Sequence, residues 1–159
     1  MTFTVTSNDI TDGATLPDGQ VYSKGNQSPH LKWSGAPEGT KSYAVTCFDP
    51  DAPTGSGFWH WTVANIPTDV TELATGASGK AMPPGSVEGR TDFSPSVYGG
   101  AAPPAGHGPH RYIFTVYAVD VPRLDLTPDS SGAFFGFNLH FHALAKASIT
   151  CTYENKGGA

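Results

Sequence analysis

Apolar residues recur along this chain in short runs with the spacing of extended strands, and turn-forming residues separate the runs. Apolar and polar positions alternate over residues 3–6 and again over 31–33, which predicts two short strands. Residues 42–49 place apolar side chains on both faces, as a strand buried on two sides does. The apolar runs over residues 58–66 and 110–120 predict two further strands. Pro67 follows the first run, and Pro122 stops the second.

One stretch near the C-terminus has helical rather than strand spacing. Residues 137–148 carry Phe137, Phe141 and Leu144 at the i, i+4, i+7 rhythm, which predicts a helix that buries this face. A last strand follows at 149–154, whereas residues 67–109 are rich in Pro and Gly and predict a long loop region. Together these elements predict a mainly β fold of two antiparallel sheets with a peripheral C-terminal helix, in a single domain spanning 1–159.

Composition adds limits on function and location. The 159 residues include 19 Gly and 14 Pro without a repeat, and the formal net charge of −5, with no cluster of Lys or Arg, argues against nucleic acid as a partner. No secretory signal is evident at the first residues and no run reaches the ~20 apolar residues of a membrane span, so we expect a cytoplasmic protein without stable membrane insertion. In that reducing compartment Cys47 and Cys151 are expected to be buried free thiols.

Carboxylates and imidazoles gather where the predicted strands meet loops. Asp49-Pro50-Asp51-Ala52-Pro53 ends one apolar run, Trp59-His60-Trp61 lies inside a second, and Gly106-His107-Gly108-Pro109-His110-Arg111-Tyr112 opens a third. Rigid turns of this kind can hold polar groups on a sheet. The three segments therefore predict the lining of a small-molecule site.

Strand alternation sorts these side chains by face. It places His110 and Tyr112 on one face and Arg111 on the other, and it predicts that His60 opposes both Trp59 and Trp61. By the same parity, the two aspartates of the first segment point the same way across Pro50. Two imidazoles, a phenol and one or two carboxylates thus converge at one end of the sheets.

Such a set can hold a phosphate or a carboxylate. Imidazolium and phenol groups donate hydrogen bonds, backbone N–H groups add more, and an aspartate fixes an imidazole tautomer. Binding should tighten at acidic pH as the imidazoles become charged. Taken alone, each residue also fits a structural role, since a strand histidine is often a core residue and Asp-Pro-Asp is often only a turn. The agreement of three segments favours a site.

The same segments, with Ser28–Gly35 and Tyr98–Pro104, resemble the phosphatidylethanolamine-binding protein family, in its bacterial Raf-kinase-inhibitor-like branch. The resemblance covers nearly the whole chain in order and spacing. It implies two antiparallel sheets with an anion pocket at one end, Trp59 or Trp61 packing the rim, and Arg111 in a structural salt bridge. The pocket residues that it implies are Asp49, Asp51, Pro53, His60, Pro103, His110 and Tyr112.

Two features depart from the family pattern. Bacterial members often have Cys where this chain has Ala102, and the long mammalian C-terminal helix with its lid-like tyrosine has no clear counterpart. Tyr153 is a poor match for that tyrosine and is left outside the predicted site.

We therefore expect a non-catalytic protein that binds a phosphate or phospholipid head group, with a regulatory or inhibitory role toward a protein target and with neither cofactor nor metal. A homodimer is compatible with the sequence, which does not specify one. Inhibition of a kinase or protease independently of any ligand is one alternative.

Two catalytic or metal-dependent alternatives also stay open. A small hydrolase could use an Asp–His pair with Ser94 or Ser96, although no Gly-x-Ser-x-Gly motif is present. A metal could be bound by His60, His107, His110, Asp49 and Asp51, although their spacing matches no fixed signature, and His140 and His142 do not share a helical face.

Overall fold

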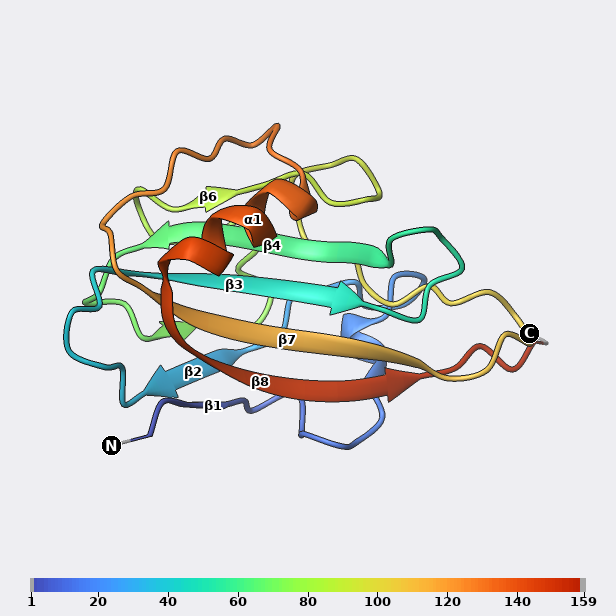
Figure 1. The fold of residues 1–159 in the computed structure, drawn as a ribbon. Helices are drawn as coiled ribbons and strands as arrows, with labels where there is room; N and C mark the ends of the chain where they lie inside the picture. The colour runs from blue at the N-terminus through green and yellow to red at the C-terminus, as the bar shows by residue number, and fades with distance from the viewer. Residues whose placement is uncertain (1, 158–159) are drawn as a thin grey trace.

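Two antiparallel β-sheets form the protein, and one α-helix lies on the outer face of the larger sheet (Figure 1). A computed structural model describes residues 2–157. Three strands in the order β1-β2-β5 make the smaller sheet, and five in the order β6-β4-β3-β7-β8 make the larger one. This confirms the predicted fold class. The elements are β1 (Thr4–Thr6), a 3-10 turn η1 (Asp18–Gln20), β2 (Leu31–Ser34), β3 (Ser42–Asp49), β4 (Phe58–Ile66), β5 (Glu72–Leu73), β6 (Val87–Glu88), β7 (His110–Val119), α1 (Gly132–His142) and β8 (Ala143–Tyr153).

Strand β3 is the centre of the larger sheet, as its two-sided apolar pattern predicts. Tyr43, Val45 and Cys47 face the smaller sheet and belong to the main core between the two sheets. Ala44 points to the other side, where it packs with Phe135 of α1 in a second cluster. Burial on both faces makes β3 a rigid support for the residues that follow it at Asp49.

The C-terminal helix begins and ends earlier than its sequence pattern predicts, so the predicted helix over 137–148 is wrong. Ser131 caps the helix by accepting the Phe134 N–H at 3.1 Å, and Phe135 and Leu139 form the buried face. Phe137 and Phe141 are instead 60% and 65% exposed.

The last strand is correspondingly longer than predicted, at 143–153 instead of 149–154. Ala143, Ala145 and Ala147 alternate with exposed neighbours, which suits a strand as well as a helix. Antiparallel pairing with β7 extends from His110↔Tyr153 to Val119↔Ala143. This ladder, which local periodicity does not reveal, decides in favour of the strand.

A β-bulge in β4 sets the direction of His60. Trp61 pairs with Cys47 and Trp59 pairs with Phe48, so His60 is an extra residue between two consecutive positions of β3. His60 and Trp61 therefore both point toward the core between the sheets, whereas Trp59 packs against Phe48 with tilted rings at a centroid distance of 4.4 Å. The predicted opposition of His60 to both tryptophans is wrong for Trp61 because simple alternation ends at the bulge.

Both cysteines are buried free thiols, as expected. Cys47 lies on β3 and Cys151 on β8, and β7 separates them. Burial raises the pKa of both thiols. Neither thiol is therefore activated toward nucleophilic or redox chemistry. Within residues 2–157, the one α-helix is too short to cross a bilayer.

Candidate anion-binding pocket

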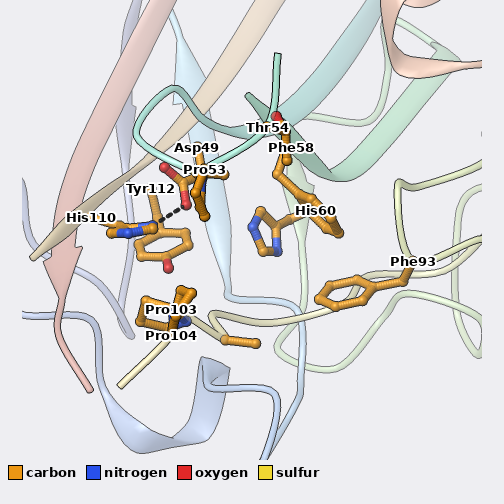
Figure 2. A pocket seen from close by; sticks show the side chains of 12 residues that line it. Asp49, Pro53, Thr54, Phe58, His60, Phe93, Pro103, Pro104, His110 and Tyr112 are labelled. Atoms are coloured by element: carbon orange, nitrogen blue, oxygen red, sulfur yellow. Dashed lines mark hydrogen bonds and ion pairs between the residues drawn. The ribbon is translucent and has the colours of Figure 1, made fainter. Parts of the chain in front are cut away.

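A cavity of about 230 Å³ opens at the end of the sheets where β3 ends and β4 and β7 begin (Figure 2). Its walls come from the turn after β3, from the start of β4, from the start of β7 and from two loop segments of the region between β4 and β7. The lining residues are Asp49, Ala52, Pro53, Thr54, Phe58, His60, Phe93, Ala102, Pro103, Pro104, His110 and Tyr112.

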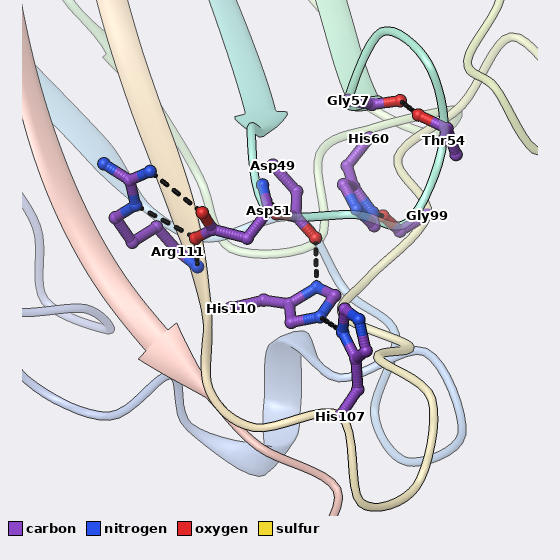
Figure 3. A network of polar contacts seen from close by, with 9 residues as sticks. All are labelled: Asp49, Asp51, Thr54, Gly57, His60, Gly99, His107, His110 and Arg111. Carbon is purple, nitrogen blue, oxygen red and sulfur yellow. Dashed lines mark hydrogen bonds and ion pairs between the residues drawn. The ribbon is translucent and has the colours of Figure 1, made fainter.

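Asp49 and His110 form a buried pair at the base of the cavity. The Asp49 carboxylate lies 2.7 Å from His110 Nδ1, and both side chains are almost fully buried. The other carboxylate oxygen of Asp49 accepts the Asp51 N–H at 2.7 Å, which fixes the carboxylate in place. Since a carboxylate can only accept, His110 carries a hydrogen on Nδ1. The second ring nitrogen of His110, Nε2, lies 2.6 Å from Nδ1 of His107 (Figure 3).

His60 is held by the backbone of the loop opposite. Its Nδ1 lies 2.8 Å from the Gly99 carbonyl oxygen. A carbonyl oxygen only accepts, so Nδ1 carries the hydrogen and Nε2 is the nitrogen available to a ligand. Burial lowers the pKa of His60 below its ordinary value, against a smaller opposing effect of the Gly99 hydrogen bond and the Asp49 charge. His60 is therefore neutral in the empty pocket at neutral pH.

Tyr112 places a buried hydroxyl in the same cavity. Among residues 2–157 this hydroxyl forms no well-aligned hydrogen bond, and its contact with the nearby Asp49 carboxylate is at most a weak one. Burial, and after it the negative charge of Asp49, raises the pKa of Tyr112 well above its ordinary value. The phenol consequently stays protonated at every physiological pH and keeps a hydrogen to donate. Its ring packs against His60 at a centroid distance of 5.2 Å.

The upper walls are apolar. Phe58 and Phe93 meet edge to face at 4.7 Å between centroids, and Phe93 stacks on the half-exposed Tyr22 at 4.6 Å. Pro103 and Pro104 close the opposite side (Figure 2). The cavity thus combines a polar base with an aromatic and proline-lined mouth, which excludes water from most of a small ligand.

The structure does not place Asp51 in the cavity, although parity across Pro50 predicts it there. The backbone turns after Asp49, and Asp51 points outward to Arg111 (Figure 3). Its two oxygens accept from Arg111 Nε and Nη2 at 2.9 Å, and one also accepts the Arg111 backbone N–H. The guanidinium lowers the pKa of Asp51 to about 2. Arg111 therefore makes the expected structural salt bridge.

Six of the seven predicted site residues line the cavity: Asp49, Pro53, His60, Pro103, His110 and Tyr112. Neither tryptophan packs its rim. Trp61 is fully buried and its indole N–H donates to Glu88, while Trp59 packs under α1, where a side chain on Gly132 would collide with it.

Sequence reasoning missed the aromatic part of the rim and the role of His107. Phe58 has the parity of His60 two residues later, which is a signal that could have identified it. Phe93 lies in the long loop region, where no periodicity marks it. The sequence predicts a role for His107 only in the metal alternative, whereas the structure places its ring against His110.

Metal binding finds no further support in the geometry. Within residues 2–157, no group of three or more His, Cys, Asp or Glu side chains is arranged to hold a metal ion. Asp51, one of the five candidate ligands of the metal alternative, is paired with Arg111.

Comparison with known proteins identifies the family. The model of the phosphatidylethanolamine-binding protein family matches residues 6–154. The chain belongs to the phosphatidylethanolamine-binding protein family. This member is 54% identical over 155 residues to the UPF0098 protein YbhB of Escherichia coli, an alignment that covers 93% of this chain and 98% of that protein.

Solved structures of the family agree with the fold. Escherichia coli YbcL, described as a member of the mammalian PEBP family, is similar to this family member with a TM-score of 0.94 and 50% identity, covering 96% of this chain and 98% of that one. The PEBP homologue CT736 of Chlamydia trachomatis has a TM-score of 0.82 at 28% identity, covering 96% and 97%.

Proposed function

We propose that this phosphatidylethanolamine-binding protein family member binds a small anion, phosphate or a phospholipid head group, without doing chemistry on it. The observation that carries the proposal is the buried Tyr112 hydroxyl, which has a hydrogen to donate and, among residues 2–157, only a weak contact with Asp49 to receive it. A buried donor without a partner costs about 1–3 kcal/mol, so a ligand that accepts from it recovers this energy. His60 and His110 line the same cavity beside it.

The charges and hydrogens on the side chains at the bottom of the cavity decide which ligands fit. With His60 neutral and Asp49 held as an acceptor by His110, the donor at the bottom of the cavity is the Tyr112 hydroxyl. An anion therefore binds together with a proton, carried either on an imidazole or on the ligand itself. Hydrogen phosphate and phosphomonoesters supply such a proton, and imidazolium would stabilise their remaining charge.

The apolar mouth favours an anion that carries an organic substituent. Phe58, Phe93 and the two prolines line the path between the base and solvent. Contact with these side chains buries apolar area on a head group or ester chain at about 25 cal/mol per Å². We therefore expect phosphorylethanolamine to bind more tightly than inorganic phosphate.

Several contacts support binding over catalysis. The one hydroxyl besides Tyr112 on the cavity wall, that of Thr54, donates to the Gly57 carbonyl oxygen at 2.5 Å within its own turn. Ser96 donates to Pro128 at 2.6 Å, and neither Ser94 nor Ser96 lines the cavity. The Asp49–His110 pair of the hydrolase alternative is present, but it lacks an adjacent nucleophile within residues 2–157. A screen with esterase and phosphatase substrates, using His110→Ala as the control, tests that alternative.

Calorimetric titration with phosphate, acetate and phosphorylethanolamine tests the proposal. We expect wild-type protein to bind phosphate, His60→Ala to bind it at least about 10-fold more weakly, and Arg111→Ala to bind it unchanged. Arg111 is the matched control because it is a cationic side chain near the site whose guanidinium is paired with Asp51 outside the cavity. Absence of binding, or equal loss in both variants, contradicts the proposal.

The cellular role is a separate proposal. Three further properties remain predictions. Pull-down from cell extract tests for inhibition of a kinase or protease, sedimentation tests for a homodimer, and cell fractionation tests for a cytoplasmic location.

A further inference from the structure

His107 occupies the one nitrogen of His110 that a ligand could use. Its Nδ1 lies 2.6 Å from His110 Nε2, and the two rings meet edge to face at a centroid distance of 4.9 Å (Figure 3). The other nitrogen of His110 is bonded to Asp49. His110 lines the cavity but has both of its ring nitrogens engaged, whereas His107 is exposed and does not line the cavity.

We propose that His107 competes with the ligand: it holds His110 Nε2 when no ligand is bound, and it gives this nitrogen up to an oxygen of an anion that binds together with a proton. The inference rests on the proposed function, because it requires an anion in the cavity. The ligand must break the contact between His107 and His110 before it can bond to His110, and the free energy that this costs weakens its binding. His107 therefore sets the affinity of the pocket without touching the bound ligand.

The local backbone allows this exchange. His107 lies between Gly106 and Gly108, whose φ angles are +76° and +90°, and apart from each glycine's own chain neighbours no heavy atom lies within 4 Å of where its side chain would start. The loop is nevertheless anchored, since the Gly106 N–H donates to Asn155 at 2.9 Å and the His107 N–H donates to Pro104 at 3.2 Å. Rotation of the His107 side chain alone releases His110 and leaves these backbone bonds intact.

The energetic balance favours the ligand. An imidazole released at the surface exchanges its contact with His110 for hydrogen bonds to water, so the net loss is that of an ordinary partly exposed hydrogen bond. Because His110 Nδ1 carries the hydrogen toward Asp49, the bond between Nε2 and an anion oxygen uses the proton that binds with the anion; such a charge-assisted bond is about twice as strong as a neutral one. Removal of the competitor should therefore tighten binding by the equivalent of one ordinary hydrogen bond, about 2- to 10-fold.

The experiment compares wild type, His107→Ala and His140→Ala by calorimetric titration with inorganic phosphate, at one pH and one ionic strength. His140 is the matched control because it is an exposed histidine on α1, away from the cavity. We expect His107→Ala to bind phosphate about 2- to 10-fold more tightly than wild type, and His140→Ala to bind it as wild type does. Unchanged or weaker binding by His107→Ala, with wild type still binding, overturns the inference and leaves the proposed function intact. Absence of binding in all three proteins overturns both.

A second measurement does not depend on a variant. Nitrogen–nitrogen scalar coupling across the His107–His110 hydrogen bond, measured by NMR on labelled wild-type protein, should be present without ligand and vanish at saturating phosphate. Coupling that persists while the His110 and Tyr112 signals report a bound anion shows that His107 is not displaced, and that result also overturns the inference.

Discussion

Replacement of Tyr112 by phenylalanine should make the ligand-free protein more stable and its pocket weaker. The hydroxyl is buried and forms no well-aligned hydrogen bond within residues 2–157, so its contact with Asp49 offsets little of a desolvation cost of about 1–3 kcal/mol. The ring is kept, so its packing against His60 and the core remains. We expect the free energy of unfolding to rise by about 1 kcal/mol, which for a chain of this length raises Tm by about 2–4 °C. Phosphate binding should weaken by roughly 10- to 100-fold, the loss of one hydrogen bond to a charged group.

The assay is denaturant unfolding in phosphate-free buffer, combined with calorimetric titration. Thr62→Val is the matched control, because the Thr62 hydroxyl is also buried without a partner among these residues but lies outside the cavity. It should gain stability and keep its affinity for phosphate. A Tyr112→Phe protein that is less stable than wild type by 1 kcal/mol or more would show that the hydroxyl is already satisfied in the folded chain, and the argument from an unpaired donor would then be wrong.

Three further predictions concern protonation and packing. Burial lowers the pKa of His60, so its imidazole must take up a proton before it can stabilise an anion. Sulfate, whose own charge is constant, should therefore bind more tightly as pH falls from 8 to 5, with uptake of about one proton. An affinity for sulfate that does not change with pH contradicts this. The pKa of Asp51 is lowered to about 2, so the stabilisation from its pairing with Arg111 is present above about pH 4 and is lost as pH falls through 2. Urea unfolding of Asp51→Asn should show a deficit below about 1 kcal/mol above about pH 4 that shrinks as pH approaches 2, and a deficit independent of pH excludes ion pairing as its cause. Gly132→Ala would bring a Cβ to 2.2 Å from the Trp59 indole and should lower the free energy of unfolding by about 1–3 kcal/mol. Gly136→Ala meets nothing closer than 3.7 Å and should raise it by up to about 1 kcal/mol. Thermal unfolding of both variants measures these changes, and equal effects refute the steric argument.

The sequence predicts the elements that depend on local pattern. Strands 42–49 and 58–66 have the predicted bounds, and the strand predicted at 110–120 ends one residue earlier, at Val119. These three strands are predicted well because prolines, glycines and charged turn residues mark the ends of their apolar runs. The central position of β3 follows from its two buried faces. These features need no knowledge of the partner strands.

The remaining errors arise from contacts between distant segments. The apolar pattern predicts the helix too far toward the C-terminus, because Phe137 and Phe141 have helical spacing but point to solvent. Pairing with β7 places residues 143–148 in β8 instead. Asp51 was misplaced because its partner Arg111 is 60 residues away.

The pocket illustrates the same division. Asp49, His60, His110 and Tyr112 were identified from the faces of predicted strands and from the family resemblance. The bulge that aims His60 into the core requires the register of two strands, which no single segment specifies. The contact of His107 with His110 depends on the course of a glycine-rich loop, and its exposed side chain gives no periodic signal.

Diffraction from crystals of the protein soaked in phosphate tests the central claim most directly. The account predicts an anion in the cavity with one oxygen within hydrogen-bond distance of the Tyr112 hydroxyl and others near Nε2 of His60 and His110. An empty cavity at saturating phosphate, or an anion bound elsewhere while the Tyr112 hydroxyl keeps no partner, would contradict it.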